Sequence, residues 1–184
     1  MIDLAGVADR LRRQTVEVTD DGQGLGSGLL WPPGWAITNA HVVRRRHITV
    51  RLGDGRRLDA TLVARDVDAD VALLRLADTG VPSAVIAPPE AARVGSLVVA
   101  IGHPFGVRGA VTAGIIHAIA PMRRGGAPCI LSDVRLAPGN SGGPLADAAG
   151  RVLGLNAMIV GRLAVAIPMG RVSDFVRAAG VEGV

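Results

Sequence analysis

The feature that most constrains the fold of this chain is a succession of short apolar runs, each bounded by Gly, Pro or Asp. Runs of this length between turn-forming residues are typical of β-strands. Aromatic residues make up 2% of the chain and Tyr is absent, whereas hydrophobic residues make up 49%. The core is therefore built from Val, Leu, Ile and Ala, a composition that favours strands. The sequence predicts an all-β fold.

The predicted strands fall into two groups of six, separated by a Pro-containing stretch at residues 77–90. In the first group the predicted strands are residues 15–19, 28–31, 36–38, 48–52, 58–64 and 71–76. In the second group they are residues 97–101, 110–119, 130–134, 143–146, 152–159 and 163–167. Apolar residues at helical spacing predict a closing helix from Gly170 to Ala179.

These groups predict a double six-stranded β-barrel with short N- and C-terminal helices. We expect an N-terminal helix at 1–14, a first barrel at 15–80, a linker and second barrel at 81–169, and a C-terminal helix at 170–184. Within 77–90, only residues 84–86 resemble a short strand.

Composition excludes several classes of function. All 20 basic residues are Arg, so a Walker lysine, a Schiff-base lysine and a Ser-Lys dyad are absent. The tight basic run Arg44–Arg46 lacks interleaved aromatic residues, and we interpret it as a solvated turn, with no nucleic-acid partner expected. No cofactor or metal site is expected, because the four histidines lack the spacing of a zinc site. The single cysteine, Cys129, lies in an apolar run and is predicted to be inert.

The sequence contains no sign of a membrane-spanning segment, and it does not indicate a cellular compartment for the protein. No stretch is long and apolar enough to span a bilayer. Residues 1–14 mix acidic and basic side chains with apolar ones, and they contain no apolar signal core. The location is left open by these residues alone.

The strongest local motif is Pro138-Gly139-Asn140-Ser141-Gly142-Gly143-Pro144. It also matches the G-x-S-x-G elbow of α/β-hydrolases, but Gly142, Gly143 and Pro144 oppose the helix that must follow such a serine. A glycine before the serine lets the amides of Gly139 and Ser141 turn toward a common point, as an oxyanion hole requires. An ordinary Gly-rich turn remains an alternative at this point.

A serine nucleophile needs a base, and the base needs an orienting acid. His41 is the best candidate base, because it follows the predicted strand 36–38 in a short turn at the rim of the first barrel. Asp70 is the best candidate acid, since it opens the apolar run 71–74 and can be drawn to the barrel seam. The chain order His, Asp, Ser is that of the chymotrypsin fold.

At these residues the sequence resembles the protease domain of the HtrA/Deg family of trypsin-like serine peptidases, which act in protein quality control. The blocks that carry the resemblance are Gly26-Ser27-Gly28, Ile37-Thr38-Asn39-Ala40-His41-Val42-Val43, Asp70-Val71-Ala72-Leu73-Leu74, Gly102-His103-Pro104-Phe105-Gly106 and the serine motif. The resemblance covers residues 24–170, that is, the protease domain only, with no PDZ domain. It implies a chymotrypsin-like double barrel.

The resemblance also implies roles for individual residues. His41 is then the general base, Asp70 its orienting acid and Ser141 the nucleophile, with Gly139, Asn140 and Ser141 forming the oxyanion loop. The expected specificity pocket is formed by Asn156, Ala157, Met158 and Val165. Because these are small or apolar, cleavage after Val, Ala or Leu is expected. Polypeptide substrates, a trimer and a periplasmic or extracytoplasmic location are further implications.

Two positions depart from the family pattern. Arg135 stands where a small residue is usual, and it is either solvated or favours an acidic residue before the scissile bond. His103 replaces the usual Asn. Two rival functions also remain: a catalytically silent peptide-binding module of the same fold, and an esterase that uses the same three residues.

Overall fold

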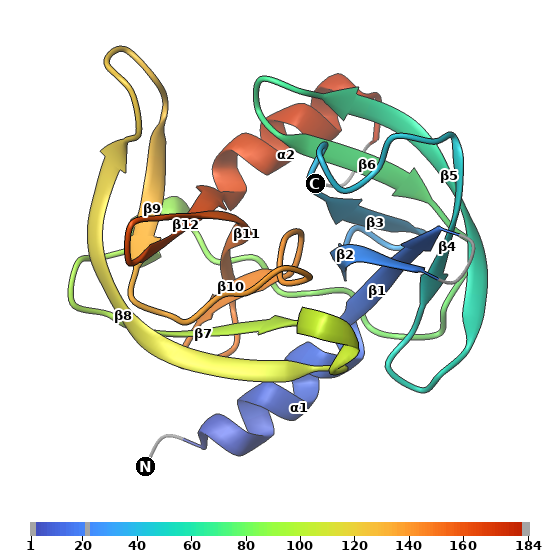
Figure 1. Ribbon diagram of the computed structural model, residues 1–184, viewed down its shortest axis with the longest axis horizontal. Coiled ribbons are helices and arrows are strands. Elements are labelled where there is room, and N and C mark those ends of the chain that lie inside the picture. The colour runs from blue at the N-terminus through green and yellow to red at the C-terminus, as the bar shows by residue number, and fades with distance from the viewer. Residues whose placement is uncertain (1–2, 21–22, 182–184) are drawn as a thin grey trace.

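The computed structural model describes residues 3–20 and 23–181 and forms two barrels that lie side by side (Figure 1). The first barrel closes in the order β1-β2-β3-β6-β5-β4, and the second in the order β10-β11-β12-β9-β8-β7. Neighbouring strands pair antiparallel throughout. The predicted chymotrypsin-like double barrel is confirmed.

The strands of the first barrel are β1 (Thr15–Asp20), β2 (Gln23–Leu30), β3 (Trp35–Thr38), β4 (His47–Arg51), β5 (Arg57–Asp66) and β6 (Val71–Arg75). Those of the second are β7 (Leu97–Gly102), β8 (Ala110–Pro121), β9 (Pro128–Ser132), β10 (Pro144–Asp147), β11 (Val152–Val160) and β12 (Leu163–Pro168). Two 3₁₀ turns, η1 (Pro89–Ala91) and η2 (Pro104–Gly106), flank β7.

Helices α1 (Leu4–Gln14) and α2 (Met169–Ala178) lie at the two ends of the chain. The side chain of Asp3 caps α1 by accepting from the amide of Gly6 at 2.9 Å. Residues 1–2 and 182–184, which the sequence assigns to the terminal helices, lie outside the described residues. No helix in the described part of the chain is long and apolar enough to cross a membrane.

The apolar core has three parts. One cluster fills the first barrel and another fills the second. The third lies between the barrels: it joins Leu29 and Leu73 of the first barrel to Ile101 and Leu155 of the second. Both helices contribute to this third cluster, α1 through Val7 and Leu11 and α2 through Val172 and Val176. The helices therefore cover the seam between the barrels.

The strand predicted at 84–86 forms only a single bridge, between Ile86 and Val152 at the start of β11. Except for β2, the predicted strands of both barrels differ from the observed ones by only one or two residues at one or both ends. The larger difference is β2, which begins at Gln23, whereas a strand was expected only from Gly28. Its Gly-rich first half pairs with β1 and contains a register shift, and this pairing extends the strand.

Candidate active site

His41 and Asp70 lie in contact at the edge of the first barrel. His41 occupies a turn directly after β3, and Asp70 precedes β6, the strand that pairs with β3. The imidazole Nδ1 lies 2.9 Å from Asp70 Oδ2, and the backbone amide of His41 donates to Oδ1 at 3.0 Å. Since a carboxylate only accepts, Nδ1 carries the proton and Nε2 is left as an acceptor.

The backbone at Asp70 is itself specialised. Its φ is +55°, in the left-handed region, where Asp and Asn are the side chains best tolerated. The side-chain amide of Asn39 donates to the carbonyl of Asp70 at 2.9 Å. Asn39 is wholly buried, so its hydrogen bond holds the backbone of Asp70 to the interior of the protein. In the sequence, the only signal for Asn39 was its place in the block around His41.

Ser141 lies on the loop that enters β10 of the second barrel. Its hydroxyl donates to the carbonyl of Ala157 at 3.0 Å, and no hydrogen bond joins it to His41 in the described part of the chain. The two segments are nevertheless adjacent: a Cβ atom placed on Gly26 would lie 2.8 Å from Val42, the neighbour of His41, and 3.0 Å from the carbonyl oxygen of Ser141.

The loop before Ser141 presents two free backbone donors. Among residues 3–20 and 23–181, neither the amide of Gly139 nor that of Ser141 has a hydrogen-bond partner. Asn140, between them, donates from its backbone to Ala137 at 3.0 Å. Gly139 has a φ of +105°, and a Cβ there would collide with the carbonyl of His103, so only glycine fits. The arrangement can hold an oxyanion.

An apolar hollow of about 170 Å³ opens beside Ser141. It is lined by Leu136, Ala137, Pro138, Asn140, Ser141, Met158 and Ile159. Met158 is therefore the one predicted specificity residue that lines it. Ala157 and Val165 line a neighbouring hollow of about 400 Å³, which also reaches Asp70. Leu136, Ala137, Pro138 and Ile159 were not predicted from the sequence to bind substrate.

Two other predicted residues lie elsewhere. Asn156 is wholly buried, and its side-chain amide donates to the carbonyl of Pro144 at 2.9 Å beneath the serine loop. Arg135 is exposed and lines neither of the two hollows. A substrate-binding role stays a prediction for both residues. The buried hydrogen bond of Asn156 supports the loop that carries Ser141.

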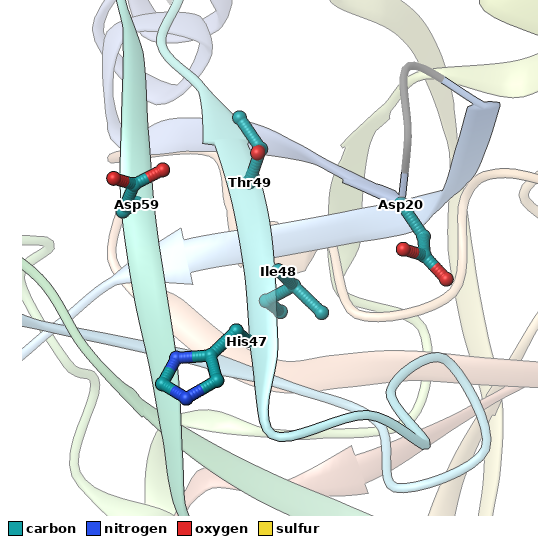
Figure 2. A pocket seen from close by; sticks show the side chains of 5 residues that line it. All are labelled: Asp20, His47, Ile48, Thr49 and Asp59. Carbon is teal, nitrogen blue, oxygen red and sulfur yellow. The ribbon is translucent and has the colours of Figure 1, made fainter.

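The other histidines lie in different settings. His103 is buried at the end of β7, and burial, together with the charges of Arg108 and Arg51, lowers its pKa to about 4. His117 on β8 lies 3.3 Å from Asp133, which directly follows β9. The antiparallel pairing of β8 with β9 creates this exposed pair, which the sequence does not reveal. His47 lies in an open hollow of the first barrel (Figure 2).

Neither this hollow nor another place holds a metal-binding cluster within the described ranges. In Figure 2 the hollow is lined by Asp20, His47, Ile48, Thr49 and Asp59. Asp20 and Asp59 belong to β1 and β5, the strands on either side of β4, so their carboxylates do not converge on His47.

Cys129 is half-buried at the start of β9 and also lines the larger hollow. Burial raises the pKa of its thiol, against the smaller opposing effect of Arg171. The thiolate, which is the reactive form, is therefore disfavoured.

A family model for the trypsin-like peptidase domain matches residues 26–155. The chain belongs to the trypsin-like peptidase family. Two similar curated proteins are named probable periplasmic serine endoprotease DegP-like. The one from Halomonas elongata is 43% identical over 148 residues, which is 78% of this chain and 31% of the relative. The one from Ectopseudomonas mendocina is 41% identical over 159 residues, which is 81% of this chain and 34% of the relative.

Solved structures agree with this placement of the trypsin-like peptidase domain. The HtrA-type protease AlgW with a decapeptide superimposes with a TM-score of 0.90 at 27% identity, over 99% of this chain and 69% of that one. AlgW with a tripeptide gives 0.88 at 31% identity, over 96% and 63%. The resemblance to HtrA/Deg proteases is confirmed for the protease domain, and the chain spans about a third of the length of the curated relatives.

Proposed function

We propose that this domain is a serine endopeptidase that cleaves unfolded or flexible polypeptides through Ser141, His41 and Asp70. The observation that carries the proposal is the hydrogen-bonded pair His41–Asp70, at 2.9 Å, beside a serine whose loop offers two unpartnered amides. Membership of a peptidase family supports the same reading.

The reaction begins with a rotation of the Ser141 side chain. Its hydroxyl leaves the carbonyl of Ala157 and turns toward Nε2 of His41, which takes the proton as Oγ attacks the peptide carbonyl carbon. Asp70 keeps Nδ1 protonated and stabilises the imidazolium that forms. Catalytic hydrogen bonds of this kind often tighten only when substrate is present.

The carbonyl oxygen of the substrate becomes an oxyanion, which the amides of Gly139 and Ser141 stabilise. The imidazolium then returns its proton to the leaving amine, and the C–N bond breaks to leave an ester on Ser141. A water molecule, deprotonated by His41, attacks this ester. The bond to Ser141 Oγ breaks, His41 returns the proton to Oγ, and the acid product leaves. Each amide donor contributes about 3 kcal/mol to the stabilisation of the transition state.

The apolar hollow beside Ser141 supports a preference for Val, Ala, Leu or a similar residue before the scissile bond. Its lining carries no charged side chain. A peptide library in which basic residues are preferred at that position would contradict this assignment.

The name of the structural relative AlgW includes a bound decapeptide, and the names of the curated relatives include a periplasmic location. We infer polypeptide substrates and an extracytoplasmic location for this chain. Cell fractionation tests the location. A trimer stays a prediction from the resemblance, which light scattering tests.

The decisive experiment treats wild type, Ser141→Ala and Ser173→Ala with a fluorophosphonate probe, beside a casein digest and a small-ester assay. Ser173 is the matched control, because its hydroxyl also donates to a backbone carbonyl, at 2.9 Å, but in α2. The proposal expects labelling and casein cleavage by wild type and Ser173→Ala only. Ester cleavage without casein cleavage would indicate the esterase, and no labelling would indicate the silent binding module.

A further inference from the structure

Ser27 is a wholly buried serine on β2 of the first barrel that contacts the oxyanion loop of the second barrel twice. Its backbone amide donates to the carbonyl of Ser141 at 2.8 Å. Its hydroxyl donates to the carbonyl of Gly139 at 2.7 Å. One residue therefore holds the carbonyls of both residues whose amides are free to bind an oxyanion.

The directions of these hydrogen bonds follow from the number of protons available. The hydroxyl of Ser27 has one proton, and the Gly139 carbonyl can only accept it. The oxygen of Ser27 then accepts from the backbone amide of His103 and from its Nδ1, both at 3.1 Å. His103 thus bears its proton on Nδ1, and every lone pair and proton of the Ser27 hydroxyl is used.

The backbone of Ser27 is also held by neighbouring residues. Its carbonyl accepts from the hydroxyl of Thr38 at 2.6 Å. Gly142, with a φ of +86°, approaches so closely that a Cβ atom there would overlap the Ser27 carbonyl. Ser27 is consequently held from both sides, and it cannot move without moving the serine loop.

The amide directions of Gly139 and Ser141 depend on how the chain is oriented at these two residues. Gly139 adopts a conformation that is open to glycine alone, and glycine has many other conformations available. A loop with such freedom needs an external restraint to keep its donors on one point. The Gly139 carbonyl accepts two hydrogen bonds, a long one from the backbone amide of His103 at 3.4 Å and a short one from the hydroxyl of Ser27 at 2.7 Å. The shorter bond makes Ser27 the main restraint.

We propose that Ser27 is a positioning residue for the oxyanion hole, which holds Gly139 and Ser141 in their productive orientation from the opposite barrel. This rests on the proposed peptidase function. The oxyanion hole is then complete only while the two barrels are docked, since the restraint and the donors belong to different barrels. Ser27 itself touches no substrate and takes part in no proton transfer.

The test measures binding of a tetrahedral adduct separately from binding of the peptide. A peptide aldehyde that ends in valinal forms a hemiacetal oxyanion with Ser141, whereas the matched peptide that ends in valinol cannot. The ratio of their inhibition constants is determined for wild type, Ser27→Ala and Thr15→Val. Thr15 is the matched control, because it is a buried hydroxyl that donates to a backbone carbonyl at 2.7 Å, that of Leu11.

For Ser27→Ala we expect the aldehyde-to-alcohol preference to fall about tenfold or more, with kcat reduced and KM little changed. The alcohol should bind as it does to wild type. Thr15→Val should lose stability to a similar extent and retain the full preference. If Ser27→Ala loses stability yet keeps the wild-type preference, the residue is merely structural and the inference is overturned.

If Ser27→Ala does not fold, Ser27→Cys takes its place, since a thiol fills the site but donates and accepts only weakly. The same fall in preference is expected, and its absence overturns the inference equally. Failure of the peptidase proposal is recognised separately: wild type would then show no aldehyde preference and no casein cleavage at all.

Discussion

Asp70 holds His41 at two points, by accepting from the imidazole Nδ1 at 2.9 Å and from the backbone amide of the same residue at 3.0 Å. The carboxylate therefore sets both the position of the turn and the tautomer of the ring. An amide in its place would preserve the shape of the site and remove the charge.

Asp70→Asn tests this relationship. Asn tolerates the φ of +55°, so the fold is preserved, but its side chain can no longer enforce the proton on Nδ1. We expect kcat/KM on a fluorogenic peptide to fall by about a thousandfold or more. Asp133→Asn is the control, because Asp133 also lies beside a histidine, His117, on an exposed surface. Equal activity in the two variants would contradict the role of Asp70.

Gly26 separates the His41 segment from the serine loop, and its lack of a side chain determines how closely they approach. In Gly26→Ala the new Cβ would lie 2.8 Å from Val42 and 3.0 Å from the Ser141 carbonyl, so one of them must move. A misplacement of reacting groups by about 1 Å lowers activity by about a hundredfold. We expect a large loss in fluorophosphonate labelling rate.

Gly170→Ala is the control for that variant. Gly170 lies in α2, where an added Cβ meets open space, and alanine there should stabilise the protein by about 0.5–1 kcal/mol. Unchanged labelling in Gly26→Ala would show that the space between Val42 and Ser141 is not critical.

His103 predicts how stability depends on pH. Its pKa is lowered to about 4 in the folded protein, chiefly by burial and further by Arg108 and Arg51. Glu17, Arg51 and His103 line a common hollow between the barrels. Between pH 6.5 and about 4, the unfolded chain binds a proton that the folded chain does not. The contribution of neutral His103 to stability is thus present above pH 6.5 and is lost as the pH falls through this window.

The loss amounts to roughly 3 kcal/mol at about 1.4 kcal/mol per pKa unit. Urea unfolding of wild type and of His103→Asn at several pH values measures this loss of stability. Asn has no titratable group, but its side-chain nitrogen is bonded to Cγ, as Nδ1 of histidine is. Wild type should lose more stability than His103→Asn below pH 6.5. Parallel curves would contradict the assigned protonation state.

Leu11 of α1 is wholly buried in the cluster between the barrels. Leu11→Ala should lower the free energy of unfolding by about 2–5 kcal/mol, because it removes apolar contacts with both barrels. Val94→Ala, at a side chain that is 64% exposed, is the control and should change it little. Chemical denaturation measures both. A small effect of Leu11→Ala would mean that α1 is not part of the cooperative core.

The sequence was sufficient to predict the barrels because apolar runs and turn residues are local signals. The same signals failed at residues 23–27, where glycines indicate a loop but pairing with β1 forms a strand. Tertiary pairing overrides local preference there. The displaced ends of other strands have the same cause.

The candidate triad could be proposed from the sequence, because His41, Asp70 and Ser141 each lie in a short motif next to an apolar run that predicts a strand. The hydrogen bond from Ser141 to Ala157 could not, because it depends on a side-chain rotation. Nor could the contacts of Ser27 with Gly139 and His103, which join residues that are 112 and 76 positions apart. Such contacts arise only when the barrels meet.

The placement of the third apolar cluster has a consequence for how the chain tolerates cleavage. Each barrel contains one apolar cluster of its own. The third cluster, between the barrels, contains residues from both barrels and from both helices. A single cut in residues 77–90 would leave each fragment with the residues of its own barrel cluster and with one exposed hydrophobic flank. The exposed flank of each fragment is complementary to that of the other, so we expect this protein to reassemble from two separately made pieces.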